Sequence, residues 1–139
     1  MIRAVIDTSV LVSAFIGHPG AAPAEVVAAW RDRRFTLIMS PHLLGELTEV
    51  LARPKLARWA DEGRGAAYAT AFAAQAELHA DVAAEPATRD PSDDYLIALA
   101  RSADADLLVS VDRDLTEAHL DDITVVTPAG FLAGLGPRA

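Results

Sequence analysis

The sequence contains no cysteine, which excludes disulfide bonds and thiolate-bound metal sites. Histidines are few and scattered, at positions 18, 42, 79 and 119, without the spacing of roughly two to five residues that is typical of zinc sites. The motifs GxGxxG, Gly-Lys-Ser/Thr and GxSxG are also missing. Zinc binding, nucleotide cofactors and serine hydrolase chemistry therefore lack support in this chain.

Long apolar runs are absent as well. The longest ones are broken by polar residues well before the roughly 18 residues needed to cross a bilayer. The first expected strand begins almost at Met1, and no basic segment followed by an apolar one precedes it. Together with the absence of cysteine, this predicts a cytoplasmic protein that is neither exported by a signal peptide nor inserted in a membrane.

Positive charge is scarce. Twelve Lys and Arg residues against 20 Asp and Glu residues give a net charge of −8, which argues against the capture of a polyanion by a basic domain. Residues 31–64 hold seven basic and five acidic side chains, whereas residues 77–122 hold thirteen acidic and three basic ones. One flank could contact phosphate while the acidic part holds a metal ion, although solvated helix faces would give the same pattern.

Short apolar runs alternate with segments of helical periodicity, which predicts an α/β fold. We expect strands at 2–6, 35–39, 78–83, 107–111 and 123–126. We expect helices at 8–16, 23–33, 41–51, 54–59, 64–79, 92–103 and from 128 onward. The alternation implies right-handed crossovers and a mainly parallel sheet covered by helices on both sides. With 139 residues, 52% of them hydrophobic, we expect one domain, 1–139.

Two acidic residues follow directly after expected buried strands. Asp7 comes after the strand at 2–6, and Asp112 comes after the strand at 107–111. Because ligands bind at the carboxyl ends of parallel strands, these two side chains would converge if the strands were neighbours. Each of them could instead merely cap the helix or turn that follows.

Three polar residues near these two are expected to support a site. Asp114 lies two residues after Asp112 and could orient a metal-bound carboxylate or bind a second ion. Ser9 and Ser110 could donate hydrogen bonds to a carboxylate, a metal-bound water or a phosphate. Of the two aspartates in this turn, we expect Asp112 to point inward.

The helix at 41–51 offers one carboxylate towards the interior. An advance of about 100° per residue places Glu46 at the edge of the apolar face and Glu49 on the opposite side. Glu49 should therefore be solvated, and Glu46 is the candidate for a functional role. A glutamate at the edge of an apolar face could also pair with an arginine.

Three acids surround the start of the helix at 92–103. Asp93 continues the i, i+3, i+4 spacing of the apolar face, which predicts that it faces the core and that Asp94 faces outward. Asp90 lies in the preceding loop and is a weaker candidate for the same place. Acids are also favoured in the first turn of any helix by the helix dipole.

The favoured acids each lie inside an otherwise apolar stretch. They are Asp7, Glu46, Asp93 and Asp112. Because a carboxylate is costly to desolvate, such a set indicates a shared cation. Mg²⁺ prefers oxygen ligands and keeps several waters, which suits carboxylates that have no histidine beside them.

Four segments resemble successive motifs of the PIN domain family. They are residues 5–11, 40–56, 90–100 and 108–115, which read VIDTSVL, SPHLLGELTEVLARPKL, DPSDDYLIALA and LVSVDRDL. Each segment alone is a weak signal, but the four occur in order and span nearly the whole chain. The sequence is most similar to the small prokaryotic branch of toxin–antitoxin toxins, the VapC-like ribonucleases.

The resemblance implies a three-layer α/β/α sandwich in which Asp7, Glu46, Asp93 and Asp112 bind Mg²⁺ or Mn²⁺ and RNA phosphodiesters are hydrolysed. Our hypothesis is that three of these residues coordinate the metal, while Glu46 binds it through water or positions the nucleophile. Asp94 stands where this branch commonly has Asn, which adds a negative charge to the site.

The resemblance also implies a cognate antitoxin as partner, and it is compatible with a homodimer. The apolar helices around Trp30 and Trp59 could supply the dimer contact, although tryptophans are more often core residues. Two other interpretations stay open. One is a binding or regulatory module that is inactive in isolation, and the other is a metal-dependent nuclease without a toxin role.

Overall fold

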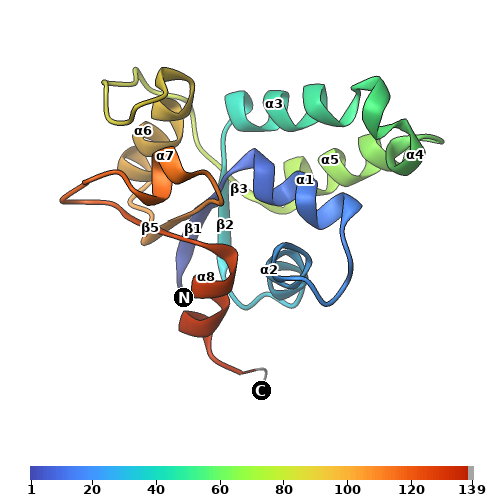
Figure 1. Ribbon diagram of the computed structural model, residues 1–139, viewed down its shortest axis with the longest axis horizontal. Coiled ribbons are helices and arrows are strands. Elements are labelled where there is room, and N and C mark those ends of the chain that lie inside the picture. The colour runs from blue at the N-terminus through green and yellow to red at the C-terminus, as the bar shows by residue number, and fades with distance from the viewer. Residues whose placement is uncertain (138–139) are drawn as a thin grey trace.

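Five short strands form one sheet in the computed structural model, which describes residues 1–137. They are β1 (Arg3–Ile6), β2 (Thr36–Met39), β3 (Glu77–Leu78), β4 (Leu107–Val109) and β5 (Thr124–Val126). Their order across the sheet is β3-β2-β1-β4-β5, and every neighbouring pair is parallel (Figure 1). The predicted parallel α/β fold is confirmed, although β4 ends two residues earlier than expected.

The central strands are apolar on both faces, as is usual for parallel strands that helices cover on both sides. In the middle of the sheet, Val5 lies opposite Ile38 on one side and Leu108 on the other. All three side chains are completely buried. This pairing sets β1 and β4 next to each other, so the residues that follow them share one edge of the sheet.

Helices cover both faces of the sheet. They are α1 (Thr8–Ile16), α2 (Ala22–Arg31), α3 (Pro41–Leu51), η1 (Pro54–Leu56), α4 (Ala57–Ala60), α5 (Arg64–Gln75), η2 (Pro91–Asp93), α6 (Asp94–Ser102), α7 (Arg113–Thr116) and α8 (Pro128–Leu135). Figure 1 shows α1, α2, α3 and α5 on one side of the sheet and α6 on the other. The expected three-layer α/β/α arrangement is therefore confirmed, and the connections change sides between β1 and β4.

Helix α3 begins where the sequence predicts. The side chain of Ser40 accepts a hydrogen bond from the backbone N–H of Leu43, and Pro41 occupies the first helical position. These two residues satisfy a backbone donor and preset the backbone angle at the start of the helix. The cap fixes the phase of α3, and that phase turns Glu46 towards the sheet edge.

The segment between α5 and η2 differs from the sequence-based expectation. Helix α5 ends at Gln75 instead of residue 79, and β3 covers two residues instead of the expected 78–83. Ala76 is already extended, and the ion pair between Glu77 and Arg3 holds the chain against the sheet edge. The backbone N–H of His79 donates to Met39 O, after which the chain leaves the sheet.

Aromatic packing fills the layer between the sheet and its helices. Trp30 stacks on Phe72 with ring centroids 4.7 Å apart, and Tyr68 packs edge-on against Phe72. Trp30 is 8% exposed, and Trp59 packs against the core as a partly buried residue. Their membership of the core, the commoner role of tryptophan, is confirmed, so Trp30 offers little surface for a dimer contact.

Within residues 1–137, no helix is both long enough and apolar enough to cross a membrane. The described strands and helices pack on one hydrophobic core. That residues 1–139 form a single domain stays a prediction.

Two glycines in helices provide a matched test of this packing. A Cβ placed on Gly65 would stand 2.9 Å from Cβ of Ala60, whereas nothing lies within 4 Å of the same position on Gly45. We expect Gly65→Ala to lower the free energy of unfolding by about 1–3 kcal/mol through overpacking. Gly45→Ala should raise it by about 0.5–1 kcal/mol through reduced backbone entropy. Urea denaturation measures both, and a stabilising Gly65→Ala would contradict the observed packing of α4 against α5.

Candidate functional site

Asp7 lies at the carboxyl end of β1, where β1 and β4 are held together. Its backbone N–H donates to Val109 O over 2.9 Å, so the chain of β4 passes directly beside it. The side chain is 7% exposed and accepts hydrogen bonds from the hydroxyls of Ser110, at 2.8 Å, and Ser9, at 3.2 Å. Burial nevertheless raises the pKa of Asp7, because these hydrogen bonds only partly offset the loss of hydration.

Ser110 links the residues that follow β1 and β4. Its buried hydroxyl donates to Asp7 Oδ2 and accepts from the backbone N–H of Asp112 over 2.9 Å. Asp112 in turn accepts from the backbone N–H of Asp114 over 2.8 Å and thereby caps α7. The expected meeting of Asp7 and Asp112 at one sheet edge is observed, with Ser110 between them.

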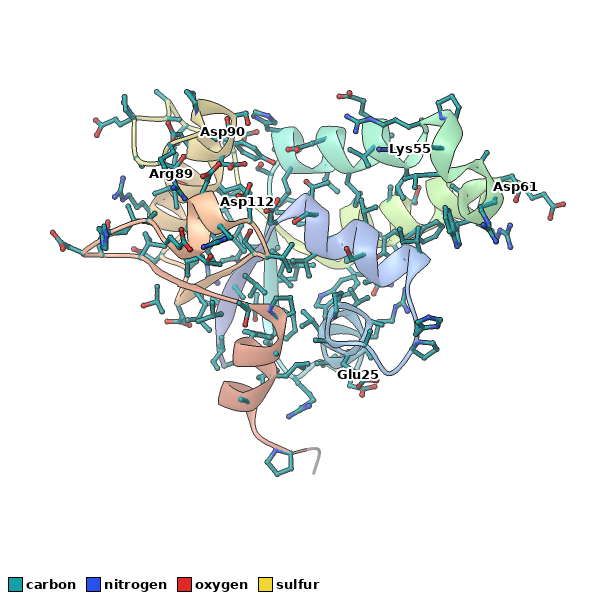
Figure 2. All side chains as sticks on the ribbon, in the orientation of Figure 1. Glu25, Lys55, Asp61, Arg89, Asp90 and Asp112 are labelled. Carbon is teal, nitrogen blue, oxygen red and sulfur yellow. The ribbon has the colours of Figure 1, made fainter. Side chains whose placement is uncertain are left out.

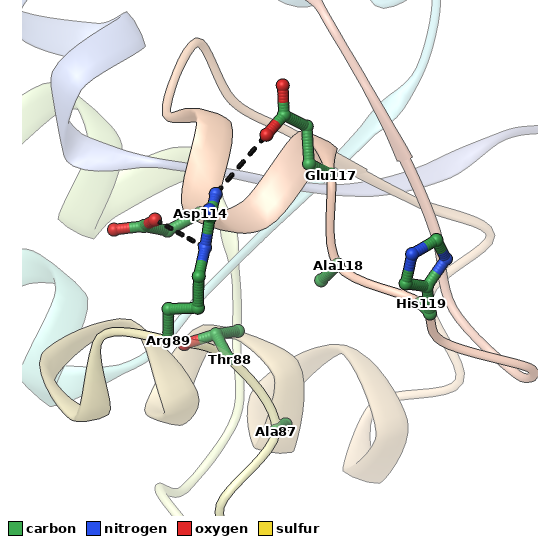
Figure 3. Close-up of a pocket in the computed structure, with 7 residues that line it drawn as sticks. All are labelled: Ala87, Thr88, Arg89, Asp114, Glu117, Ala118 and His119. Atoms are coloured by element: carbon green, nitrogen blue, oxygen red, sulfur yellow. Dashed lines mark hydrogen bonds and ion pairs between the residues drawn. The ribbon is translucent and has the colours of Figure 1, made fainter.

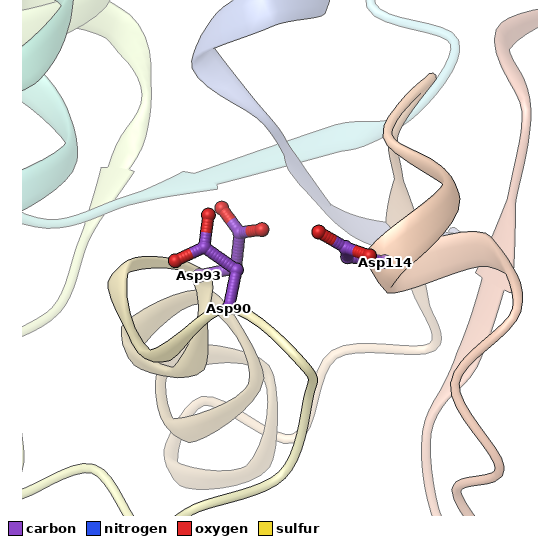
Figure 4. Close-up of side chains that lie close together, drawn as sticks. All are labelled: Asp90, Asp93 and Asp114. Carbon is purple, nitrogen blue, oxygen red and sulfur yellow. The ribbon is translucent and has the colours of Figure 1, made fainter.

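Three aspartates bring carboxylate oxygens within reach of a single ion. One oxygen each of Asp90, Asp93 and Asp114 lies within 4.8 Å of the others. Figure 4 shows Asp90 and Asp93, from the start of η2 and its end, on one side of a gap and Asp114, from α7, on the other. Figure 2 shows Asp90 and Asp112 in the same part of the molecule, away from Lys55 on the far side.

Asp93 is the most perturbed of these acids. Burial raises its pKa to about 7, and the neighbouring carboxyls of Asp112, Asp7 and Asp90 add to the effect. Among residues 1–137, its buried Oδ2 has no hydrogen-bond partner. A buried carboxylate oxygen without a donor is costly, and either a proton or a cation would relieve it.

The donor set fits a hard divalent cation. The candidates are all carboxylate oxygens, which suit Mg²⁺ and Mn²⁺ and do not suit a soft metal. Asp93 is shared by two groups, because it lies beside Asp7 and Asp112 and also belongs to the cluster with Asp90 and Asp114. The arrangement could therefore hold one ion or two, and its ligands stay a prediction.

Glu46 reaches the same region from α3. It is half-buried, and its Oε2 accepts a hydrogen bond from the hydroxyl of Tyr95 on α6. Burial, and then Glu46, raise the pKa of Tyr95, so this hydroxyl stays a donor. The charge of Glu46 also raises the pKa of Asp7, which places the two carboxylates near each other. Glu49 is exposed, as the helical phase predicts.

The predicted outward position of Asp94 is wrong. Asp94 is 5% exposed, and its Oδ1 accepts hydrogen bonds from the backbone N–H and the hydroxyl of Thr88, both over 2.9 Å. The expectation fails because α6 has no solvent face at its start, where residues 94–100 are all buried, and because the preceding loop folds over Asp94. Asp94 thus holds the loop that carries Asp90.

Sequence reasoning missed Arg89, which lies beside the aspartate cluster. Its guanidinium pairs with Asp114 Oδ1 at 3.0 Å and with Glu117 at 3.3 Å (Figure 3). These residues, with His119, line a hollow of about 730 Å³. One signal was available, since Arg89 directly precedes Asp90 in an otherwise acidic segment.

Comparisons with known proteins bear on the family and the fold of this chain. A family model described as PIN domain matches residues 3–114. No curated protein matches the sequence. A crystal structure of VapBC2 from Rickettsia felis, bound to a DNA fragment from their promoter, has a similar fold: the TM-score is 0.62, the identity 13%, and the match covers 91% of this chain and 98% of that chain.

The pKa of Asp93 predicts how stability depends on pH without metal. Because folding raises this pKa from 3.8 to about 7, the folded state keeps a proton that the unfolded chain loses. The stabilisation by this proton is complete below pH 3.8, the pKa of the group in the unfolded chain. It is lost once the pH has risen through about 7, the pKa in the folded protein. In the presence of a chelator, we expect this group to lower the melting temperature as pH rises from about 4 to 7, with little further effect above that range.

Asp93→Asn should flatten this pH dependence, since it removes the titrating group. Glu49→Gln is the control, because it removes an exposed carboxylate from α3 and should leave the slope intact. Thermal unfolding followed by circular dichroism at several pH values measures the three proteins. An unchanged slope in Asp93→Asn would contradict the assignment of the raised pKa to Asp93.

The pairing of Arg89 predicts competition with a cation. Arg89→Ala releases Asp114, so we expect it to tighten Mn²⁺ binding by about two- to fivefold, the range of a partly exposed ion pair. Arg113→Ala is the matched control, because Arg113 pairs with Glu117 without an ion pair to Asp114. Calorimetric titration with Mn²⁺ compares the proteins, and equal affinities for the two variants would exclude this competition.

Proposed function

Because the chain belongs to the PIN domain family, we propose that it is a Mg²⁺- or Mn²⁺-dependent endoribonuclease that hydrolyses RNA phosphodiester bonds. PIN domains are generally metal-dependent nucleases, and the family supports this coarser assignment directly. The observation that carries the proposal is the buried, unpartnered oxygen of Asp93 inside a group of convergent carboxylates. Such a group is stable at neutral pH when a divalent cation occupies it.

The chemistry requires an anionic phosphodiester to be attacked by another anion. When bound, a divalent ion lowers the pKa of a water molecule and neutralises charge on the phosphate. In our proposal Asp7, Asp93 and Asp112 hold the ion, and Asp90 and Asp114 hold the outer side of the same site. Asp7 can do so without moving, because the hydroxyls of Ser9 and Ser110 fix its carboxylate.

Glu46 has a different proposed role. Its carboxylate is held by the Tyr95 hydroxyl at the rim of the site, where it can accept a hydrogen bond from the attacking water and orient it. Tyr95 stays protonated, so it acts by positioning Glu46 and takes no proton itself. In this division of roles, the carboxylates that hold the metal lie at the carboxyl end of the sheet. The carboxylate that positions the water, Glu46, lies on α3.

We further propose that the protein is the toxin of a toxin–antitoxin pair and acts in the cytoplasm as a single domain. The support is the resemblance to VapC-like ribonucleases and the fold that it shares with the VapBC2 structure, a complex bound to promoter DNA. A cognate antitoxin is then the expected protein partner, and a homodimer is compatible with the family. These assignments go beyond the membership of the PIN family itself.

The proposal predicts metal-dependent cleavage that depends on Asp93. We expect the wild type to cleave single-stranded RNA with Mn²⁺ and not with chelator. Asp93→Asn should lower the rate by about two orders of magnitude or more, because it removes a charged ligand. Asp61→Asn, an exposed carboxylate on the far side of the molecule from Asp90 (Figure 2), should retain the wild-type rate. Labelled single-stranded RNA, structured RNA and duplex DNA are compared in one gel assay.

Each outcome of this assay separates the alternatives. Full activity in Asp93→Asn would exclude the proposed role of this residue. Preferential cleavage of duplex DNA would favour a nuclease without a toxin role. The absence of cleavage of all three substrates, together with a folded protein, would favour a binding or regulatory module.

A further inference from the structure

A second hollow, of about 490 Å³, opens between the start of α3 and the start of α6. Its walls include His42, Glu46 and Arg53 from α3 and the segment after it, and Ser92 from η2. Its volume falls in the range of roughly 300–1,000 Å³ that is usual for small-molecule sites. None of the roles proposed above uses His42 or Arg53.

His42 presents a fixed aromatic surface to this hollow. One face of its ring stacks on Tyr95, with centroids 3.7 Å apart and planes 8° from parallel. Because His42 is exposed and lines the hollow, the other face of the ring is open to solvent. The backbone N–H of His42 donates to Asp81 Oδ2 over 2.8 Å, which holds the residue in place. The ring is therefore a preorganised platform.

The hollow adjoins the candidate metal site. Glu46 belongs to both, and the hydroxyl of Ser92 donates to Asp90 Oδ1 over 2.7 Å. Tyr95, which supports the His42 ring, also donates to Glu46. A nucleotide in this hollow would therefore lie next to a phosphate held at the acidic cluster.

The charge of the protein makes a stacking contact necessary. The net charge is −8 and the cluster itself is acidic, so long-range electrostatics oppose the approach of RNA. Within residues 1–137, Arg53 pairs with Glu49, which also lines the hollow, at 3.5 Å and with both side chains exposed, which is a weak pairing. Stacking of a base on an aromatic ring does not depend on charge balance and binds unpaired bases of any sequence.

We propose that this hollow holds one unpaired nucleotide of a single-stranded RNA substrate, with its base stacked on the open face of His42 and its backbone phosphate near Arg53. The proposal rests on the ribonuclease function proposed above and adds the contact that selects unpaired substrate. Duplex nucleic acid cannot offer a base to this platform without unpairing it. His42 is thus a residue for substrate binding and selection.

The test uses the full chain and a short single-stranded RNA with 2-aminopurine at one position, moved along the strand. In the Asp93→Asn protein with Mn²⁺, we expect binding to quench the fluorescence at one position, because the base stacks there. Adding His42→Ala should abolish this quenching and weaken binding about tenfold. Adding His42→Phe should restore both, because the aromatic surface returns.

Cleavage kinetics give an independent readout. In the otherwise wild-type protein, His42→Ala should raise KM about tenfold with little change in kcat, as expected for lost substrate binding. His18→Ala is the matched control, since His18 is an exposed histidine outside this hollow. Arg53→Ala should raise KM less than His42→Ala and should reduce the dependence of KM on salt.

The outcomes distinguish this inference from the ribonuclease proposal. If the wild type cleaves no RNA, the proposed function fails, and position-specific quenching would still show a stacked base. If the wild type cleaves single-stranded RNA while His42→Ala changes neither quenching nor KM, the inference is wrong. Preferred cleavage of duplex substrates, or no RNA binding by Asp93→Asn, would overturn it as well.

Discussion

Repulsion between carboxylates is the constraint on which the carboxyl end of this sheet depends. The parallel pairing of β1 and β4 brings Asp7 and Asp112 to the same edge, and the start of α6 adds Asp93. The protein holds this arrangement with hydroxyl and backbone donors: Ser110 donates to Asp7, and the N–H of Asp114 donates to Asp112. Among the described residues, no donor reaches the buried Oδ2 of Asp93. The pKa of Asp93 is raised, so the charged form of this carboxyl is the one that the site disfavours. The fold thereby creates one defined place where a proton or a cation would lower the electrostatic cost.

The same constraint shapes how the site can meet its substrate. An acidic site on an acidic protein attracts metal ions and repels phosphate, so nucleic acid cannot be gathered by charge as it is by basic domains. Arg89, the cation beside the aspartate cluster, is engaged already, since it is paired with Asp114 and Glu117. In the proposed mechanism the metal therefore serves twice, because it neutralises the site and then the phosphate. In the proposed substrate site, stacking on the open face of His42, which does not depend on charge, adds to RNA binding.

The sequence predicts those parts of the molecule that local patterns determine. The parallel pairing follows from alternating apolar runs and helices, whereas the order of the strands does not, and the Ser40-Pro41 start of α3 carries the correct phase to Glu46 and Glu49. Prediction fails where tertiary contacts set the local geometry. Helical periodicity assumes that α6 has a solvent face, but residues 94–100 are all buried, and Ala87 and Thr88 of the preceding loop donate to Asp94, which was predicted to face outward. Likewise, an Ala-rich helix carries no signal for its end at Gln75, which the pairing of Glu77 with Arg3 at the sheet edge determines.

For Asp7 and Asp112, capping a helix and binding a metal ion do not exclude each other. From the sequence, Asp7 and Asp112 can each be interpreted as helix caps or as metal ligands, and both do cap the following helix, through Oδ1. A carboxylate has two oxygens with about four lone-pair sites, so the capping N–H groups leave capacity on Oδ1 of both residues and on Oδ2 of Asp112, whereas Oδ2 of Asp7 already accepts from Ser9 and Ser110. The cap also fixes the side chain and lowers the entropy cost of binding an ion. By capping α7, Asp112 moreover orients the turn that brings Asp114 towards Asp90 and Asp93. Helix capping at the ends of parallel strands is thus a means of building a rigid carboxylate site.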